Sequence, residues 1–196
     1  MASRRSVHAP PALRRLKGDK SLLITIFAPS KVHLLEIAGL RDAFFEANEK
    51  MSSGDAYRVR LVTERGIAEE TASGVKYSPD ASIRDAIAHC DTLIVAGPYG
   101  MPVRQSADTT QWLREQALHA RRFGSTCTGA FLLAQTGLLS GRRATTHWQY
   151  ADRLAVDYPD IRVEPDSIFV RDGPVFSSAG VTAAIDLAFA LIEEDH

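Results

Sequence analysis

The segment GSTCTGAF, residues 124–131, places one cysteine among small and hydroxyl-bearing residues. The residues RRFGSTC lead into this segment as a strand, and the run GAFLLAQTGLL that follows reads as a buried helix. A strand that turns directly into a helix is typical of folds in which the two elements alternate. The segment therefore predicts that Cys127 lies at a strand-to-helix turn.

The same alternation extends in both directions from this turn. Turn residues between 66 and 83 predict a small hairpin or loop before a short helix near 81–88. The predicted fold is a single α/β domain with a doubly wound, mostly parallel sheet and helices on both faces. The expected strands are 22–27, 57–63, 91–97, 142–147 and two or three short ones within 161–180, and the expected helices are 32–49, about 103–120, 148–158 and 181–194.

Composition limits the function classes. A chain of 196 residues with 45% hydrophobic residues fits one globular domain. Its net charge of −1 gives no general attraction to nucleic acid or to an anionic membrane. Two cysteines, Cys90 and Cys127, cannot form a disulfide framework, which favours a reducing cytoplasm. No spacing of His or Cys indicates a metal site, and no cofactor is expected.

The first 20 residues differ from the rest. They carry basic residues at Arg4, Arg5, Arg14, Arg15, Lys17 and Lys20 against one acidic residue, Asp19, and they lack the apolar core of a secretory signal. We expect residues 1–20 to form a flexible basic extension and residues 21–196 to form the domain.

Cys127 has the chemistry of a nucleophile. The start of a helix offers unpaired N–H groups and partial positive charge, which favour a thiolate. The amides of Thr128 and Gly129 could also hold an oxyanion. A buried cysteine without catalytic function is the alternative, and it is the preferred interpretation for Cys90, which enters a buried strand.

Three further residues support a site at Cys127. Glu36 lies among apolar residues in HLLEIAG, where a carboxylate needs a partner or a proton, unless it is a solvated helix position. His147 follows the next predicted strand, which would place it at the same sheet edge, unless it is a core histidine. Gly97 ends the preceding strand. Trp148 is expected to pack, and Asp186 to face a helix or solvent.

These residues carry a family resemblance. STCTGAFLLAQTGLLSGRRATTHW with SSAGVTAAIDLAFALIEEDH resembles the ThiJ/PfpI superfamily of class I glutamine amidotransferase-like domains, over about residues 21–196. The resemblance is strongest to the N-terminal domain of AraC-type transcription regulators, with isonitrile hydratase as an enzymatic relative. It implies a flavodoxin-like, usually dimeric fold with Cys127 at a nucleophile elbow. It also implies that Glu36 contacts the reactive cysteine and that His147 lies near it.

One loop departs from the family pattern. IVAGPYG (94–100) matches a loop that usually carries a second glycine, and Pro98 replaces it here. Proline has no N–H, so a donor that helps to hold an oxyanion is missing. Losing one such donor slows catalysis by about 100- to 1,000-fold in other enzymes. The departure favours binding of a ligand over its catalytic turnover. The predicted ligand-binding residues are Glu36, Gly97, Pro98, Tyr99, Cys127, Thr128, His147 and Gly180.

Three functions remain open. The resemblance favours the ligand-sensing and dimerising domain of an AraC-type regulator, which would bind a small molecule and form a homodimer. Such a regulator would bind DNA only through a C-terminal helix-turn-helix domain, which would make this chain part of a longer protein. An enzyme of the isonitrile hydratase type would use Cys127, Glu36 and His147 as catalytic residues. A redox or electrophile sensor would oxidise Cys127 to a sulfinate.

Overall fold

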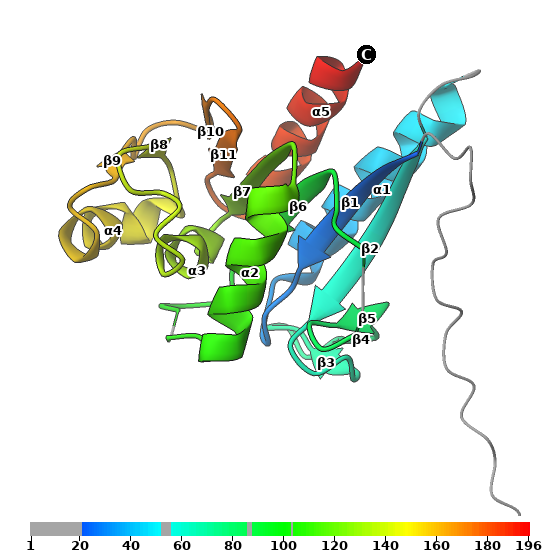
Figure 1. The fold of residues 1–196 in the computed structure, drawn as a ribbon, viewed down its shortest axis with the longest axis horizontal. Coiled ribbons are helices and arrows are strands. Elements are labelled where there is room, and N and C mark those ends of the chain that lie inside the picture. Colours follow the sequence, from blue (N-terminus) through cyan, green and yellow to red (C-terminus); the bar gives the residue numbers. More distant parts are fainter. Residues whose placement is uncertain (1–20, 52–55, 86–87, 103) are drawn as a thin grey trace, which may run out of the picture.

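The computed structural model describes residues 21–51, 56–85, 88–102 and 104–196, so the predicted basic extension at 1–20 lies outside the described residues. Helices and strands alternate along the described chain (Figure 1). The helices are α1 (Leu34–Lys50), α2 (Ala107–His119), α3 (Gly129–Ala134), α4 (Ala151–Asp157) and α5 (Ala183–Asp195), with one 3₁₀ turn, η1 (Trp148–Tyr150). The strands are β1 (Leu22–Phe27), β2 (Tyr57–Thr63), β3 (Glu69–Glu70), β4 (Lys76–Tyr77), β5 (Ala81–Ser82), β6 (Thr92–Val95), β7 (Arg122–Thr126), β8 (Arg143–Ala144), β9 (Arg162–Val163), β10 (Phe169–Asp172) and β11 (Val175–Ser178).

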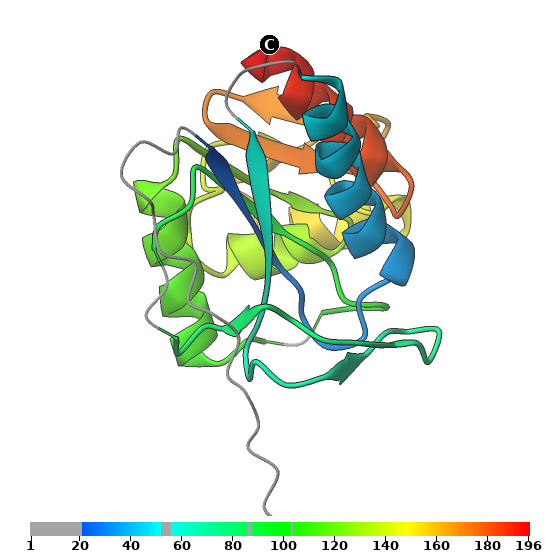
Figure 2. The same cartoon turned by 90° about the vertical axis from the view of Figure 1, so that its right-hand side faces the viewer.

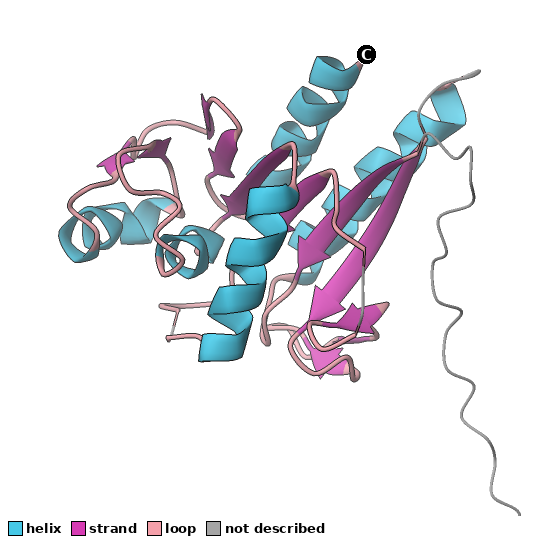
Figure 3. Ribbon diagram, viewed as in Figure 1, coloured by secondary structure: helices cyan, strands magenta, loops and turns pink. Residues whose placement is uncertain are grey.

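The strands of the central sheet lie between the helices (Figure 3). Their order is β10-β11-β7-β6-β1-β2-β5 among the described residues. All neighbouring strands in it are parallel except β10 and β11, which pair antiparallel. The carboxyl ends of β6, β7 and β11 therefore meet at one edge, the edge at which ligands bind in open α/β sheets. The predicted α/β fold with a mostly parallel sheet is confirmed.

Two helical layers cover the sheet. Helices α1 and α5 lie side by side on one face, and α2 and α3 cover the other (Figure 2). Burial of apolar side chains on both faces is the main stabilising contribution to such a fold, at about 25 cal/mol per Å² removed from water. On the first face, Ile24 and Ile26 of β1 pack with Phe44 of α1 and Leu187 of α5. None of the helices in the described ranges is long and apolar enough to cross a membrane.

The segment after β2 corrects one prediction. The hairpin is present as β3 and β4, but Ala81–Ser82 forms β5 on the edge of the sheet instead of starting a helix. The Asp85 carboxylate accepts hydrogen bonds from the Ser82 N–H (2.6 Å) and hydroxyl (2.9 Å). This local bonding closes a turn and competes with a helix. Residues 86–87, within the predicted helix, lie outside the described part.

A buried ion-pair network holds the end of α5 against the starts of the strands. Arg122, the first residue of β7, is completely buried and pairs with Glu194 and Asp195. Its guanidinium also donates to the Thr92 hydroxyl (3.0 Å) at the start of β6. A buried cation needs such partners, because desolvation of an unpaired charge costs several kcal/mol. The network therefore fixes α5 at the sheet edge opposite to Cys127.

Candidate functional site

Cys127 occupies the turn between β7 and α3, as predicted. Its φ of 53° lies in the left-handed region, which is uncommon for a residue other than glycine. Its N–H donates to the carbonyls of Ser178 (3.0 Å) and Ala179 (2.8 Å), and its own carbonyl accepts from the Thr146 hydroxyl (2.9 Å). Strain of this kind persists only where surrounding contacts hold it. The backbone therefore fixes the thiol at the carboxyl edge of the sheet.

Two glycines allow the turn to pack against β6. A Cβ at Gly97 would lie 2.6 Å from the Thr128 nitrogen, and one at Gly129 would lie 2.1 Å from the Val95 carbonyl oxygen. Real Cβ atoms do not approach backbone so closely, so both positions require glycine. Gly97 therefore serves close packing of the site as well as the turn.

Glu36 is completely buried and faces this turn from the first turn of α1. Its Oε1 accepts hydrogen bonds from the Gly97 N–H (2.9 Å) and from the Thr126 hydroxyl. Burial raises the pKa of Glu36 from 4.5 to about 7, against the lowering effect of the hydrogen bonds from Thr126 and Gly97. The alternative of a solvated helix position is wrong. The Gly97 amide is bonded to Glu36 and is therefore not free to donate to an oxyanion.

The Cys127 thiol is only 3% exposed. Burial, and then the charge of Glu36, raise the pKa of Cys127 to about 12, although hydrogen bonds from Thr128 and from the Val181 N–H act in the opposite direction. The expectation of a thiolate favoured by the helix start is therefore wrong for the free protein. The physical reason is that desolvation and a neighbouring carboxylate outweigh a helix of only six residues.

The loop after β6 lies against the chain before α1. The Thr128 hydroxyl donates to the Pro98 carbonyl (2.6 Å), and the Tyr99 N–H donates to the Lys31 carbonyl (2.9 Å). The Tyr99 ring is 69% exposed and meets the His33 ring edge to face, with 5.4 Å between their centroids. Thr128 and Pro98 thus join the Cys127 turn, whereas the Tyr99 side chain points into solvent.

The strand before His147 differs from the prediction, although the histidine lies beside the loop that follows β11. The strand before it, β8, pairs with β9 in a separate two-stranded sheet, so His147 does not follow a strand of the central sheet. Its ring lies against Gly180, where a Cβ would come within 2.9 Å of it. Burial, and then the charge of His33, lower the pKa of His147. Among the described residues, Thr146 rather than His147 makes the hydrogen bond to Cys127.

Three other residues were assessed from the sequence. Cys90 is buried and its thiol contacts the Gln116 side chain (3.7 Å), as expected of a core cysteine. Asp186 is exposed, as expected. Trp148 is 74% exposed, so the expectation that it packs is wrong. It extends from a short 3₁₀ turn beside His147, and its ring stacks on that histidine at 5.6 Å.

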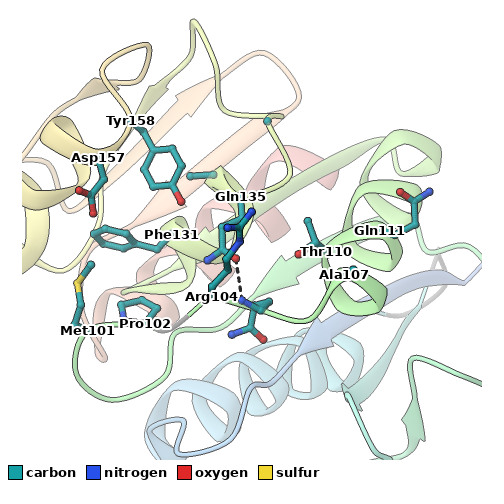
Figure 4. Close-up of a pocket in the computed structure, with 13 residues that line it drawn as sticks. Met101, Pro102, Arg104, Ala107, Thr110, Gln111, Phe131, Gln135, Asp157 and Tyr158 are labelled. Atoms are coloured by element: carbon teal, nitrogen blue, oxygen red, sulfur yellow. Dashed lines mark hydrogen bonds between the residues drawn. The ribbon is translucent and has the colours of Figure 1, made fainter.

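Two cavities open near the loop after β6. One of about 460 Å³ lies at the strand ends and is lined in part by Pro98 and Tyr99. The other, of about 860 Å³, lies between α2, α3 and the end of α4, where Phe131, Gln135 and Tyr158 line it (Figure 4). Of the described residues that line them, none is Glu36, Cys127 or His147. In the described part of the chain, no three His, Cys, Asp or Glu side chains gather as metal ligands.

Sequence reasoning missed two contributors to the site. The Val181 N–H reaches the Cys127 sulfur from the loop before α5, and a backbone amide leaves no signal in residue type. The Thr126 hydroxyl bonds to Glu36, whereas in the sequence Thr126 is only one of several small or hydroxyl-bearing residues around Cys127. Strand alternation could have found it, because the last residue of β7 must face one helical layer.

Known proteins of two kinds are similar to this chain. Isonitrile hydratase from Pseudomonas putida is 36% identical over 140 residues, which are 70% of this chain and 59% of that protein. The HTH-type transcriptional regulator CdhR from Pseudomonas aeruginosa is 33% identical over 142 residues, 72% of this chain and 42% of the regulator. The match thus spans about half the length of these relatives.

The fold agrees with solved structures. The crystal structure of Drosophila melanogaster DJ-1beta superposes with a TM-score of 0.73 over 89% of this chain and 90% of that chain, at 21% identity. The family model of the DJ-1/PfpI family matches residues 21–194. Together with the sequence motifs around Cys127, these matches confirm the resemblance, and the chain belongs to the DJ-1/PfpI family.

Proposed function

We propose that this chain is the ligand-sensing and dimerising part of an AraC-type transcriptional regulator and that it binds a small molecule without turning it over. HTH-type regulators among its relatives support this function. DNA binding would come from another domain of the same protein, because this chain has a net charge of −1. We expect it to act in the cytoplasm as a homodimer.

The observation that carries the proposal is the burial of the Cys127–Glu36 pair, which raises the pKa of both groups. A cysteine nucleophile acts as its thiolate, and a thiol whose pKa is raised to about 12 supplies very little thiolate at neutral pH. The Gly97 amide is bonded to Glu36, and Pro98 has no amide hydrogen. Two donors that an oxyanion would need are therefore absent from the turn, while polar groups for binding a ligand remain.

Ligand-induced stabilisation tests the proposal. A ligand that binds only the folded protein raises its melting temperature, and the rise grows with the logarithm of the ligand concentration above Kd. We expect some members of a panel of small polar and amine-bearing metabolites to raise the melting temperature, and the Glu36→Gln variant to lose this response. The Cys90→Ala variant is the control, because Cys90 lies in the core away from the site. A panel response that Glu36→Gln leaves unchanged would place the ligand elsewhere.

An enzyme of the isonitrile hydratase type is the second candidate, favoured by 36% identity to that enzyme. In this function Cys127 would attack the electrophilic carbon and Glu36 would supply the proton. The amides of Thr128 and Val181 near the sulfur would stabilise the developing charge. Product formation from isonitriles, amides or glyoxals, measured by mass spectrometry and lost in Cys127→Ala but not in Cys90→Ala, would establish catalysis and overturn the sensing proposal.

A further inference from the structure

The carboxyl group of Glu36 is bonded unevenly. Both hydrogen bonds described for it, from the Gly97 N–H and the Thr126 hydroxyl, arrive at Oε1. Its other oxygen, Oε2, is buried and has no hydrogen-bond partner among the described residues. A carboxyl group in water has no reason to favour one oxygen, so the protein creates this asymmetry.

The asymmetry determines where a proton can sit. A backbone N–H can only donate, so Oε1 must act as an acceptor toward Gly97, and the Thr126 hydroxyl uses the remaining acceptor capacity of the same atom. A proton on Oε1 would compete with these donors. We propose that Thr126 is a positioning residue that holds Oε1 of Glu36 as an acceptor and so directs the proton of Glu36 to the other carboxyl oxygen, Oε2.

The placement of Thr126 follows from the strand. Thr126 is the last residue of β7 and pairs in register with Ser178 of β11, so both face the α1 layer. Ser125 faces the opposite layer, where its register partner Ser177 accepts from the Thr145 N–H (2.7 Å). A valine would fill the completely buried Thr126 position with the same branched shape. Packing at this position therefore does not require the Thr126 hydroxyl, whereas Glu36 accepts a hydrogen bond from it.

The titration of Glu36 depends on few neighbours. Among the described residues, Cys127, from the turn between β7 and α3, is a titratable group whose pKa the charge of Glu36 raises. Of the α5 residues, those buried against α1 and the sheet are uncharged, namely Ala183, Ala184, Leu187, Ala188 and Leu191. Removing the Gly97 amide by substitution is impossible without changing the backbone, so Thr126 is the partner through which the proton affinity of Glu36 can be changed.

The titration of the free protein tests the proposal. The carboxyl carbon of Glu36, observed by ¹³C NMR and assigned with Glu36→Gln, reports its protonation. A hydroxyl that bonds to a carboxylate stabilises the ionised form, so Thr126→Val and Thr126→Ala should each bind the proton about tenfold more tightly. Thr126→Ser, which keeps the hydroxyl, should titrate like the wild type. A merely structural role for Thr126 would leave the Glu36 midpoint unchanged in all three variants.

A second measurement, by proton NMR of the wild type, needs no substitution. It tests the proposal even if Thr126→Val and Thr126→Ala do not fold. If the Thr126 hydroxyl and the Gly97 amide both point at Oε1, their protons must give a nuclear Overhauser contact, and the hydroxyl proton must exchange slowly with water. A folded wild-type protein without this contact, or a folded Thr126→Val with an unchanged midpoint, overturns the proposal. The proposal does not depend on the identity of any ligand. Both measurements use the protein without a ligand, so a failed ligand screen would leave them valid.

Discussion

The carboxyl group of Glu36 adds to the effect of burial in raising the pKa of the Cys127 thiol, although Glu36 and Cys127 belong to different elements. Glu36 lies in the first turn of α1, and Cys127 follows β7 at the turn into α3. The parallel sheet brings them together, because the ends of β6 and β7 are neighbours and Gly97 links one of them to Glu36. The carboxyl group of Glu36 therefore influences the protonation of Cys127.

Removing the charge of Glu36 should make Cys127 more reactive. In Glu36→Gln the like charge is lost, so the pKa of Cys127 falls and more thiolate is present at pH 8 to 9. We expect alkylation of Cys127 by iodoacetamide to accelerate by roughly tenfold, measured by peptide mass spectrometry. Cys90 in the same sample is the reference and should not change. Equal acceleration at both cysteines would indicate general loosening instead.

Protonation of Glu36 should make stability depend on pH. Its pKa is raised from 4.5 to about 7 in the folded protein, so the folded state binds the proton more tightly than the unfolded state. The stabilisation is therefore complete below pH 4.5 and is lost as pH rises to about 7, by about 3 kcal/mol. Urea unfolding of wild type and Glu36→Gln between pH 4 and 8 measures the difference. A difference that does not vary with pH would contradict the raised pKa.

Alanine should be tolerated at Gly180 and not at Gly97. The added Cβ at Gly97 would meet backbone nitrogens of Thr128 and Gly129 at 2.6 and 2.7 Å, which cannot move without displacing α3. At Gly180 it would meet the His147 ring, which can rotate away. We expect Gly97→Ala to lose about 2–3 kcal/mol in the free energy of unfolding and Gly180→Ala less than about 1 kcal/mol. Equal losses would refute the close packing of the Cys127 turn.

The buried guanidinium of Arg122 should matter far more than its exposed neighbour. Arg122→Met leaves the Asp195 carboxylate buried without its main partner, which costs about 3–5 kcal/mol. Arg121 also pairs with Asp195, but its side chain is 45% exposed, so Arg121→Ala should cost less than about 1 kcal/mol. Urea midpoints of the two variants compare them directly. Similar midpoints would mean that the network contributes little.

Local patterns in the sequence predicted the sheet, the Cys127 turn and a Glu36 carboxyl group that has hydrogen-bond partners instead of solvent. These features depend on alternation and on a carboxyl group among apolar residues, both of which are visible in sequence. The position of β8 outside the central sheet was not predictable, because two residues carry no information on which sheet they join. The raised pKa of Cys127 was also missed, since it depends on burial by α1 and β6, which are distant in sequence.

The central claim is that the fold raises the pKa of Glu36 to about 7 and keeps the neighbouring Cys127 thiol neutral. The most direct measurement is the ¹³C NMR titration of the Glu36 carboxyl carbon in the wild type and in Cys127→Ala. We predict a titration midpoint at a pKa of about 7 in the wild type. In Cys127→Ala the midpoint should also stay well above 4.5, because burial of Glu36 is the largest cause of its raised pKa. A wild-type midpoint near 4.5 would show an ionised Glu36 at neutral pH and would contradict the account.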